Sequence, residues 1–171
     1  EKGDPFALSW EQNVQASSVI STTWYEWNDK KWMSNRRKKN TLDSPLSVYE
    51  MHLGSWMRGV DDPNRFFSYR EIAERLVPYL KEMNFTHVEF MPVMEYPYDP
   101  SWGYQFTGFF AATSRFGSPQ DLMFLIDYLH KNEIGVILDW VPSHFPGYAN
   151  GLHFFDVTYL YEHEDPSKGF Q

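Results

Sequence analysis

The stretch SPQDLMFLIDYLHKNEIGVIL, residues 118–138, predicts a helix that is followed directly by a buried strand. Ser118 can cap the helix, Pro119 takes its first position, and Asp121 places an acid in its first turn. The run VIL at 136–138 is continuously apolar, as in strands that are buried on both faces of a parallel sheet. The apolar side chains of the helix recur at helical spacing, at Leu122, Leu125, Ile126 and Leu129.

The same arrangement occurs earlier in the chain. Ser68 and Glu71 have the spacing of a capping box, which predicts a helix start, and Pro78 is expected to bend that helix near its end. Strands are expected before and after it, at residues 46–53 and 86–91. The order strand, helix, strand, helix, strand predicts an α/β fold with parallel strands and right-handed crossovers. The apolar face of the earlier helix consists of Ile72, Leu76, Tyr79, Leu80 and Met83.

Two parallel architectures fit this order, an open doubly wound sheet and a closed eightfold barrel. A dinucleotide-binding sheet is disfavoured because no Gly-x-Gly-x-x-Gly follows the first strand. Long aromatic loops after the second and third strands favour a TIM (β/α)8 barrel, and such a barrel needs about 250 residues. We therefore expect residues 45–171 to be the first part of a barrel, about three β-α units, and the chain to be a piece of a longer protein.

Residues 1–44 have a different texture. They lack helical periodicity, and they contain short aromatic runs such as TTWYEW at 22–27. A basic run, NRRKKN at 35–40, follows. We interpret residues 1–44 as the tail of a β-rich module and a linker whose basic side chains face solvent.

The composition excludes several functional classes. Fifteen Lys and Arg against 23 Asp and Glu give a formal net charge of −8, which argues against a nucleic-acid partner. The absence of cysteine excludes disulfides, zinc–thiolate sites and a cysteine nucleophile. No apolar run approaches the roughly 20 residues that span a bilayer, and no signal core is visible, so we expect a soluble, cytoplasmic protein without a membrane partner. Seven Trp, eleven Tyr and fourteen Phe suit a cleft for flat, weakly charged ligands such as sugars or bases.

Candidate binding residues follow the second and third strands, because ligands meet the carboxyl ends of strands in α/β folds. Trp102 and Tyr104 flank Gly103 in the first of these loops, and aromatic rings there can stack on a sugar face. Asp139 and His144 can reach one pocket at the end of the third strand, as hydrogen-bonding groups for sugar hydroxyls. No His-Glu-x-x-His, Gly-x-Ser-x-Gly or phosphate-binding loop is present, so we expect no metal and no cofactor.

Several segments together resemble one enzyme family. Residues 45–56 (PLSVYEMHLGSW) resemble the opening barrel strand of bacterial 1,4-alpha-glucan (glycogen) branching enzymes. Residues 86–95 (THVEFMPVME), 102–105 (WGYQ) and 115–117 (RFG) resemble the second unit of that family. Residues 136–144 (VILDWVPSH) resemble the first conserved block of the alpha-amylase superfamily, Asp-x-x-x-x-His, which hydrolases and transferases share.

The resemblance implies a reaction and a role for each candidate residue. Such enzymes cut an α-1,4-linked glucan and join the released chain to a 6-hydroxyl, by a retaining mechanism with two carboxyl groups. Tyr104 would stack on the sugar beside the scissile bond, and Trp102 would line the cleft. Asp139 would lie under the same ring and support an arginine near the nucleophile, while His144 would hydrogen-bond one of its hydroxyls.

The resemblance also implies what these residues do not include. The nucleophile and the acid/base of the family belong to later strands, and no segment here matches their blocks. The isolated 171-residue chain is therefore expected to be inactive, with an α-glucan such as glycogen or starch as the substrate of the whole enzyme. Ser143 stands where many amylases carry a calcium-binding Asn, so no calcium is expected there. Residues 1–44 would be the end of the family's β-sandwich carbohydrate-binding module and a linker.

Two alternatives remain open at this point. The chain could be a fragment of an amylase-type or debranching glucan hydrolase, which shares the Asp-x-x-x-x-His block. It could also be a non-catalytic glucan-binding module that uses the aromatic segments as its platform. A flavodoxin-like cofactor protein is disfavoured because the sequence contains no phosphate cradle.

Overall fold

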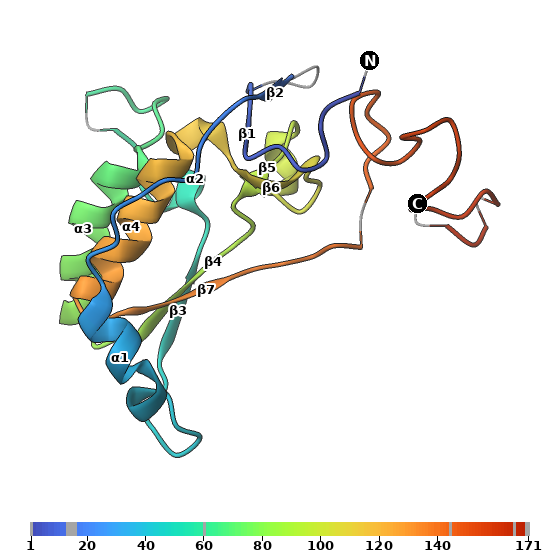
Figure 1. Cartoon of the computed structure of the whole chain (residues 1–171). Coiled ribbons are helices and arrows are strands. Elements are labelled where there is room, and N and C mark those ends of the chain that lie inside the picture. Colours follow the sequence, from blue (N-terminus) through green and yellow to red (C-terminus); the bar gives the residue numbers. More distant parts are fainter. Residues whose placement is uncertain (1, 13–16, 60, 144, 166, 170–171) are drawn as a thin grey trace. The chain divides into compact units, whose positions relative to one another are not determined.

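The computed structural model describes residues 2–12, 17–59, 61–143, 145–165 and 167–169 (Figure 1). The chain forms two compact units. The first, here called the sheet unit, consists of Trp24–Met91 and Gln120–Asp139. The second, here called the loop unit, consists of Glu1–Thr23, Pro92–Pro119 and Trp140–Gln171.

Three parallel strands form the centre of the sheet unit. They are β3 (Val48–Met51), β4 (His87–Phe90) and β7 (Gly135–Leu138), in the spatial order β3-β4-β7. Helix α3 (Tyr69–Glu82) connects β3 to β4 after the short helix α2 (Leu53–Trp56), and α4 (Pro119–Lys131) precedes β7. Figure 1 shows α3 and α4 side by side, and an ion pair between Arg70 and Asp121 joins them. The predicted α/β order of strands and helices is confirmed.

Helix α3 begins where the capping box predicts. The backbone amide of Glu71 donates to Oγ of Ser68, and the carboxylate of Glu71 accepts from the backbone amide of Ser68 at 2.8 Å. The helix continues through Pro78 to Glu82. The predicted apolar face is confirmed at three fully buried positions, Ile72, Leu76 and Leu80.

The predicted apolar face of α3 extends one position too far. Met83 is 54% exposed, because it is the C-cap of the helix and the chain turns away at Asn84, whose φ is 59°. Tyr79 is half-buried, and its ring lies 5.2 Å from that of Tyr49 on β3. The helix therefore contacts β3 through Tyr79, and its buried face ends at Leu80.

Residues 30–39 are helical, so the prediction of a non-helical linker is wrong there. Helix α1 (Lys30–Lys39) buries Trp32, whose ring stacks on that of His130 at the end of α4, with centroids 5.1 Å apart. Oδ2 of Asp29 lies 2.8 Å from Nδ1 of His130, and Glu133 forms ion pairs with two lysines of α1. Tertiary contacts of this kind, and not the local sequence pattern, stabilise such a short helix.

Strand β7 is more exposed than its sequence predicts. Val88 and Phe90 on the central strand β4 are fully buried, but Ile137 and Leu138 on β7 are 37% and 44% exposed. The reason is that β7 pairs with β4 on one side and is the last strand of this three-stranded sheet. The expectation of burial on both faces is therefore wrong for β7 in this chain.

The loop unit contains two short antiparallel ladders. Strand β1 (Ser9–Trp10) pairs with β2 (Ser18–Val19), and β5 (Met94–Glu95) pairs with β6 (Gly108–Ala112). Two 3-10 turns, η1 (Asp99–Ser101) and η2 (Ser114–Phe116), lie close to β5 and β6 in sequence. Two apolar clusters support these ladders: Met94, Tyr96 and Phe106, and Ala7, Trp10 and Ala111. In the described parts of both units, none of the helices has the length and apolar character needed to cross a bilayer.

Candidate functional site

The candidate residues predicted from sequence fall into both units. Trp102 and Tyr104 lie in the loop unit, in the segment between β5 and β6. Asp139 follows β7 in the sheet unit. His144 lies outside the described residues. The structure thus places Trp102 and Tyr104 in one turn of the loop unit. Asp139 belongs to the sheet unit, and its surroundings are described on their own below.

The turn that carries the two aromatic residues has a fixed backbone. Trp102 ends η1 in the left-handed region with φ 56°, and its amide donates to the carbonyl oxygen of Asp99 at 3.0 Å. Gly103 follows with φ 90°, and a β-carbon there would lie 2.6 Å from the carbonyl oxygen of Pro92. Glycine is therefore required at position 103 both for its φ and for its close approach to Pro92. Trp102 is 57% exposed and Tyr104 is half-buried.

A buried carboxylate at the start of this segment collects several donors. The carboxylate of Glu95, on β5, accepts from Oγ1 of Thr113 at 3.2 Å and from the backbone amide of Ser114. It also accepts from Nη1 of Arg115 at 2.8 Å, and the side chains of Glu95 and Arg115 are only 4% and 3% exposed. Burial raises the pKa of Glu95, and the hydrogen bonds from Ser114 and the charge of Arg115 oppose part of that rise.

The same arginine contacts the first turn of the aromatic segment. Nε of Arg115 lies 2.7 Å from Oδ1 of Asp99, the first residue of η1. The guanidinium also lies over the ring of Tyr96, with Cζ 3.9 Å from the ring centroid. Burial raises the pKa of Tyr96 to about 12. Sequence reasoning did not single out Arg115 or Glu95 as a pair, because twenty residues separate them.

Asp139 lies at the carboxyl end of the parallel strands. Its backbone amide donates to the carbonyl oxygen of Phe90 at 3.0 Å, which continues the β4–β7 pairing by one residue. Its side chain hydrogen-bonds with that of Glu89. The pKa of Glu89 is raised by desolvation first, and then by the hydrogen bond and the negative charge of Asp139 and by the charge of Glu50.

The strand register explains why these three carboxyl groups share one face. Glu50 on β3 is the register partner of Glu89 on β4, and Glu89 is the partner of Ile137 on β7. Asp139 lies two residues beyond Ile137, and side chains two residues apart point to the same face of a sheet. Sequence reasoning gave Glu89 no role, because only the parallel register places it beside Asp139.

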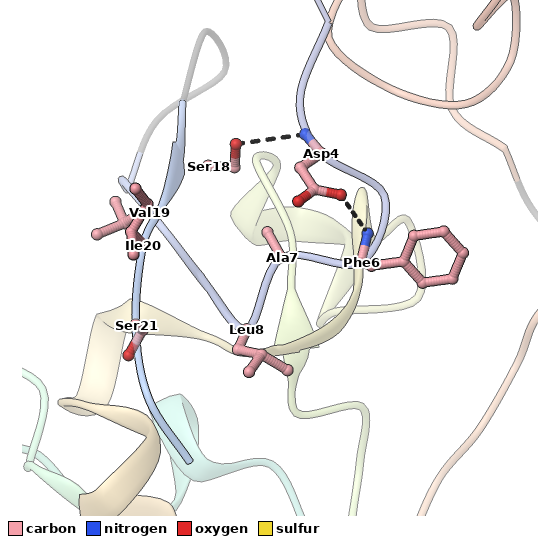
Figure 2. A pocket seen from close by; sticks show the side chains of 8 residues that line it. All are labelled: Asp4, Phe6, Ala7, Leu8, Ser18, Val19, Ile20 and Ser21. Carbon is pink, nitrogen blue, oxygen red and sulfur yellow. Dashed lines mark hydrogen bonds between the residues drawn. The ribbon is translucent and has the colours of Figure 1, made fainter.

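The loop unit also contains an open hollow of about 260 Å³, shown in Figure 2. Two polar side chains of the hollow hydrogen-bond to nearby backbone amides. Oδ1 of Asp4 accepts from the amide of Phe6 at 2.9 Å, and Oγ of Ser18 accepts from the amide of Asp4. The hollow contains none of the predicted site residues. It is lined by Asp4, Phe6, Ala7, Leu8, Ser18, Val19, Ile20 and Ser21.

A hollow of about 380 Å³ in the sheet unit includes His87 and Val136, at the amino ends of β4 and β7. It therefore lies at the end of the strands opposite to Asp139. Ligands of α/β folds meet the carboxyl ends, so this hollow is not the candidate site. Across the described residues, no group of three or more His, Cys, Asp or Glu side chains is arranged to hold a metal ion.

Comparisons with known proteins agree with this geometry. A family profile described as "Alpha amylase, catalytic domain" matches residues 61–158. The 1,4-alpha-glucan branching enzyme GlgB of Aquifex aeolicus (strain VF5) is 59% identical over 165 residues, which cover 96% of this chain and 26% of that enzyme. The enzyme of the same name from Albidiferax ferrireducens is 54% identical over 170 residues, which cover 99% of this chain and 27% of that protein.

A solved structure shows the same fold. The crystal structure of an alpha-amylase-like protein from Salmonella typhimurium superposes with a TM-score of 0.70 at 28% identity. The match covers 90% of this chain and 24% of that protein. The chain thus spans about a quarter of the length of the curated relatives and of this structure. Because the family profile covers more than half of its residues, the chain belongs to the alpha-amylase catalytic-domain family.

Proposed function

We propose that this chain is part of a 1,4-alpha-glucan branching enzyme. Such an enzyme cleaves an α-1,4-linked glucan and transfers the released chain to a 6-hydroxyl, which forms an α-1,6 branch. The observation that carries the proposal is the 59% identity to a branching enzyme over 96% of this chain. The proposed partner is an α-glucan such as glycogen or starch, and the proposed compartment is the cytoplasm.

The fold supports a place for this chain within a barrel. Strands β3, β4 and β7 are proposed as the first three strands of a (β/α)8 barrel formed by residues 45–171 and a following region. Their parallel order, with α3 and α4 between them, supports this assignment. The exposed side chains of β7 support it as well, because a fourth strand would cover them. Residues 1–44 are proposed as the end of a carbohydrate-binding module and the segment after it.

The site residues are proposed to form part of the donor-sugar pocket. Tyr104 would stack on the sugar next to the scissile bond, with Trp102 at the edge of the cleft, and the fixed backbone of their turn supports both roles. Asp139 would lie under the sugar, at the strand end where such folds bind ligands. His144 would hydrogen-bond a hydroxyl of the same sugar.

Glu89 gives Asp139 a defined partner. The hydrogen bond with Asp139 is one of the causes that raise the pKa of Glu89, after desolvation. A hydrogen-bonded neighbour restricts the rotamers of a side chain, so Glu89 would help to hold Asp139 in place. In that position Asp139 can accept from sugar hydroxyls or pair with an arginine, as its proposed role requires.

The reaction itself needs groups beyond these residues. Retaining enzymes use a carboxylate nucleophile and a carboxylic acid/base that are about 5 Å apart on either side of the glycosidic bond. Among the residues described here, we assign no pair to those two roles. We therefore propose that the 171-residue chain binds glucan weakly and does not rearrange it.

A chimaera tests the proposed function. The matched region of the Aquifex aeolicus enzyme is replaced by this chain, and the product is incubated with linear amylose. We expect new α-1,6 linkages, measured by proton NMR of the product. Release of reducing ends without α-1,6 linkages would instead support an amylase-type hydrolase, to which the likeness at 28% identity points.

The binding-module alternative requires a separate measurement. Glucan is titrated against the unmodified 171-residue chain and against the Trp102→Ala/Tyr104→Ala double variant. Point variants are preferred to deletion of residues 1–44, because α1 packs on α4 through Trp32 and His130. Tight binding by the chain together with an inactive chimaera would favour the module.

A further inference from the structure

We propose that Arg115 is a positioning residue that holds the Trp102–Tyr104 turn in the conformation that binds the sugar. This inference rests on the proposed function, because it takes that turn to be part of the saccharide site. It assigns to Arg115 a role in substrate binding that it exerts through Asp99, without contact to the sugar.

The surroundings of Arg115 match the geometry of a guanidinium and no other cation. Nη1 binds Glu95, Nε binds Asp99, and the flat face covers the ring of Tyr96. A lysine presents a single ammonium group and cannot bind two carboxylates on different edges while stacking on a ring. The three contacts therefore fix the orientation of the side chain as well as its charge.

The contacts of Arg115 form an inner and an outer arm. The inner arm joins Arg115 to Glu95 on β5, and Nη1 also lies 3.3 Å from Oγ1 of Thr113. These groups are buried, so the inner arm anchors the arginine to the β5–β6 ladder. The outer arm reaches Asp99, whose side chain is 64% exposed. Asp99 itself is exposed, and without it Arg115 keeps its buried partner Glu95, so the outer arm can be removed while the inner arm stays in place.

The outer arm is connected to the aromatic residues by backbone hydrogen bonds. The carbonyl oxygen of Asp99 accepts from the amide of Trp102, and the carbonyl oxygen of Ser101 accepts from the amide of Tyr104, each at 3.0 Å. A shift of Asp99 would therefore move the start of η1 and with it both rings. Misplacement of a substrate-positioning group by about 1 Å can lower rate or binding by a large factor. Loss of the outer arm is therefore expected to lower the affinity for the substrate.

The experiment compares two exposed aspartates that pair with arginines. Asp99→Ala removes the outer arm, and Asp61→Ala removes the pair with Arg65 in the sheet unit, where Asp61 is 70% exposed. In the branching-active chimaera, we expect Asp99→Ala to raise KM for amylose by about threefold or more, with a smaller change in kcat. We expect Asp61→Ala to leave both constants unchanged. Asp99→Asn keeps an acceptor for Nε and is expected to restore part of the affinity.

A second measurement does not depend on activity. This measurement uses the 171-residue chain and not the chimaera. Amide hydrogen exchange over residues 96–107 is expected to be about threefold or more faster in Asp99→Ala than in the wild-type chain, because η1 loses the ion pair that anchors it. Asp61→Ala is the control, with unchanged exchange in that segment. Arg115→Lys is expected to reproduce the effect of Asp99→Ala and not the wild-type behaviour.

The outcomes separate the two proposals. If the unsubstituted chimaera forms no branches, the proposed function fails, while the exchange data still report whether Arg115 orders the turn. If the chimaera branches and Asp99→Ala has the KM of the wild type, the positioning role is wrong. Full retention of affinity and exchange protection by Arg115→Lys would also overturn it, because the role requires a planar guanidinium.

Discussion

The ring of His87 occupies the space into which a β-carbon on Gly135 would project. Such a carbon would lie 2.1 Å from Cδ2 and 2.4 Å from Nε2 of the ring. The two residues are register partners on β4 and β7. Thr86 fixes the ring, since its Oγ1 lies 2.9 Å from Nδ1 of His87. The glycine is thus needed for the close approach of an aromatic ring from the neighbouring strand, and not for an unusual φ.

Gly135→Ala is expected to destabilise the chain by about 1–3 kcal/mol, because the added methyl group must displace a buried, hydrogen-bonded ring. Urea unfolding measures this change. Gly147→Ala is the control, since no atom lies within 4 Å of a β-carbon there. In the His87→Ala/Gly135→Ala double variant, the effect of Gly135→Ala should largely disappear. Equal stability of Gly135→Ala and the wild type would show that the two strands separate easily.

The pH dependence of stability should include a contribution from Glu71. Hydrogen bonds from Arg65 and Ser68 lower the pKa of Glu71 from 4.5 to about 2. Because the pKa is lower in the folded state, the stabilisation is complete above pH 4.5 and is lost as the pH falls from 4.5 toward 2. Unfolding of wild type and Glu71→Gln is compared from pH 7 to pH 3.

We expect the difference in stability between these two proteins to shrink at the acidic end of that range. Glu74→Gln removes the same charge from an exposed position of α3 and controls for net charge. A constant difference between wild type and Glu71→Gln at every pH would rule out this ionic contribution. In that case the glutamate would act only as a neutral part of the helix cap.

Trp32→Ala should detach α1 from the sheet unit. The indole is only 7% exposed and stacks on His130, so its removal is expected to cost about 3–5 kcal/mol if the helix stays docked. Undocking avoids part of that cost, and hydrogen exchange over residues 30–39 would then approach the rate of an unstructured peptide. Trp24→Ala, at a position that is 77% exposed, serves as the control. If the hydrogen exchange of α1 is unchanged in Trp32→Ala, the salt bridges of Glu133 with the lysines of α1 are enough to keep the helix docked.

The parts of the fold that could be predicted are those with local signals. The capping box of Ser68 and Glu71 and the spacing of Ile72 and Leu76 depend on residues within two turns of helix, so α3 was visible in the sequence. Helix α1 has one buried residue, Trp32, while its other apolar residue, Met33, is 45% exposed and the rest are basic or polar. It therefore shows no periodic apolar pattern.

The pairs within the candidate site are set by contacts between distant residues. Arg115 contacts Glu95 because β5 pairs with β6. Glu89 lies beside Asp139 because β4 and β7 pair in parallel. Neither relationship has a fixed spacing along the chain. Trp102 and Tyr104, in contrast, flank a glycine within three residues, so their shared turn was predictable.

The role of Tyr104 is the most direct test of the proposed pocket. In the branching-active chimaera, Tyr104→Ala should lower kcat/KM by more than about tenfold, because stacking and positioning of the sugar are both lost. Tyr104→Phe keeps the ring and should retain most of the activity, which separates stacking from the hydroxyl. Trp102→Ala should have a smaller effect, and Tyr161→Ala, at a tyrosine that is 46% exposed, should have none. Wild-type turnover in Tyr104→Ala would remove Tyr104 from the site, and the aromatic turn would then need another explanation for its fixed backbone.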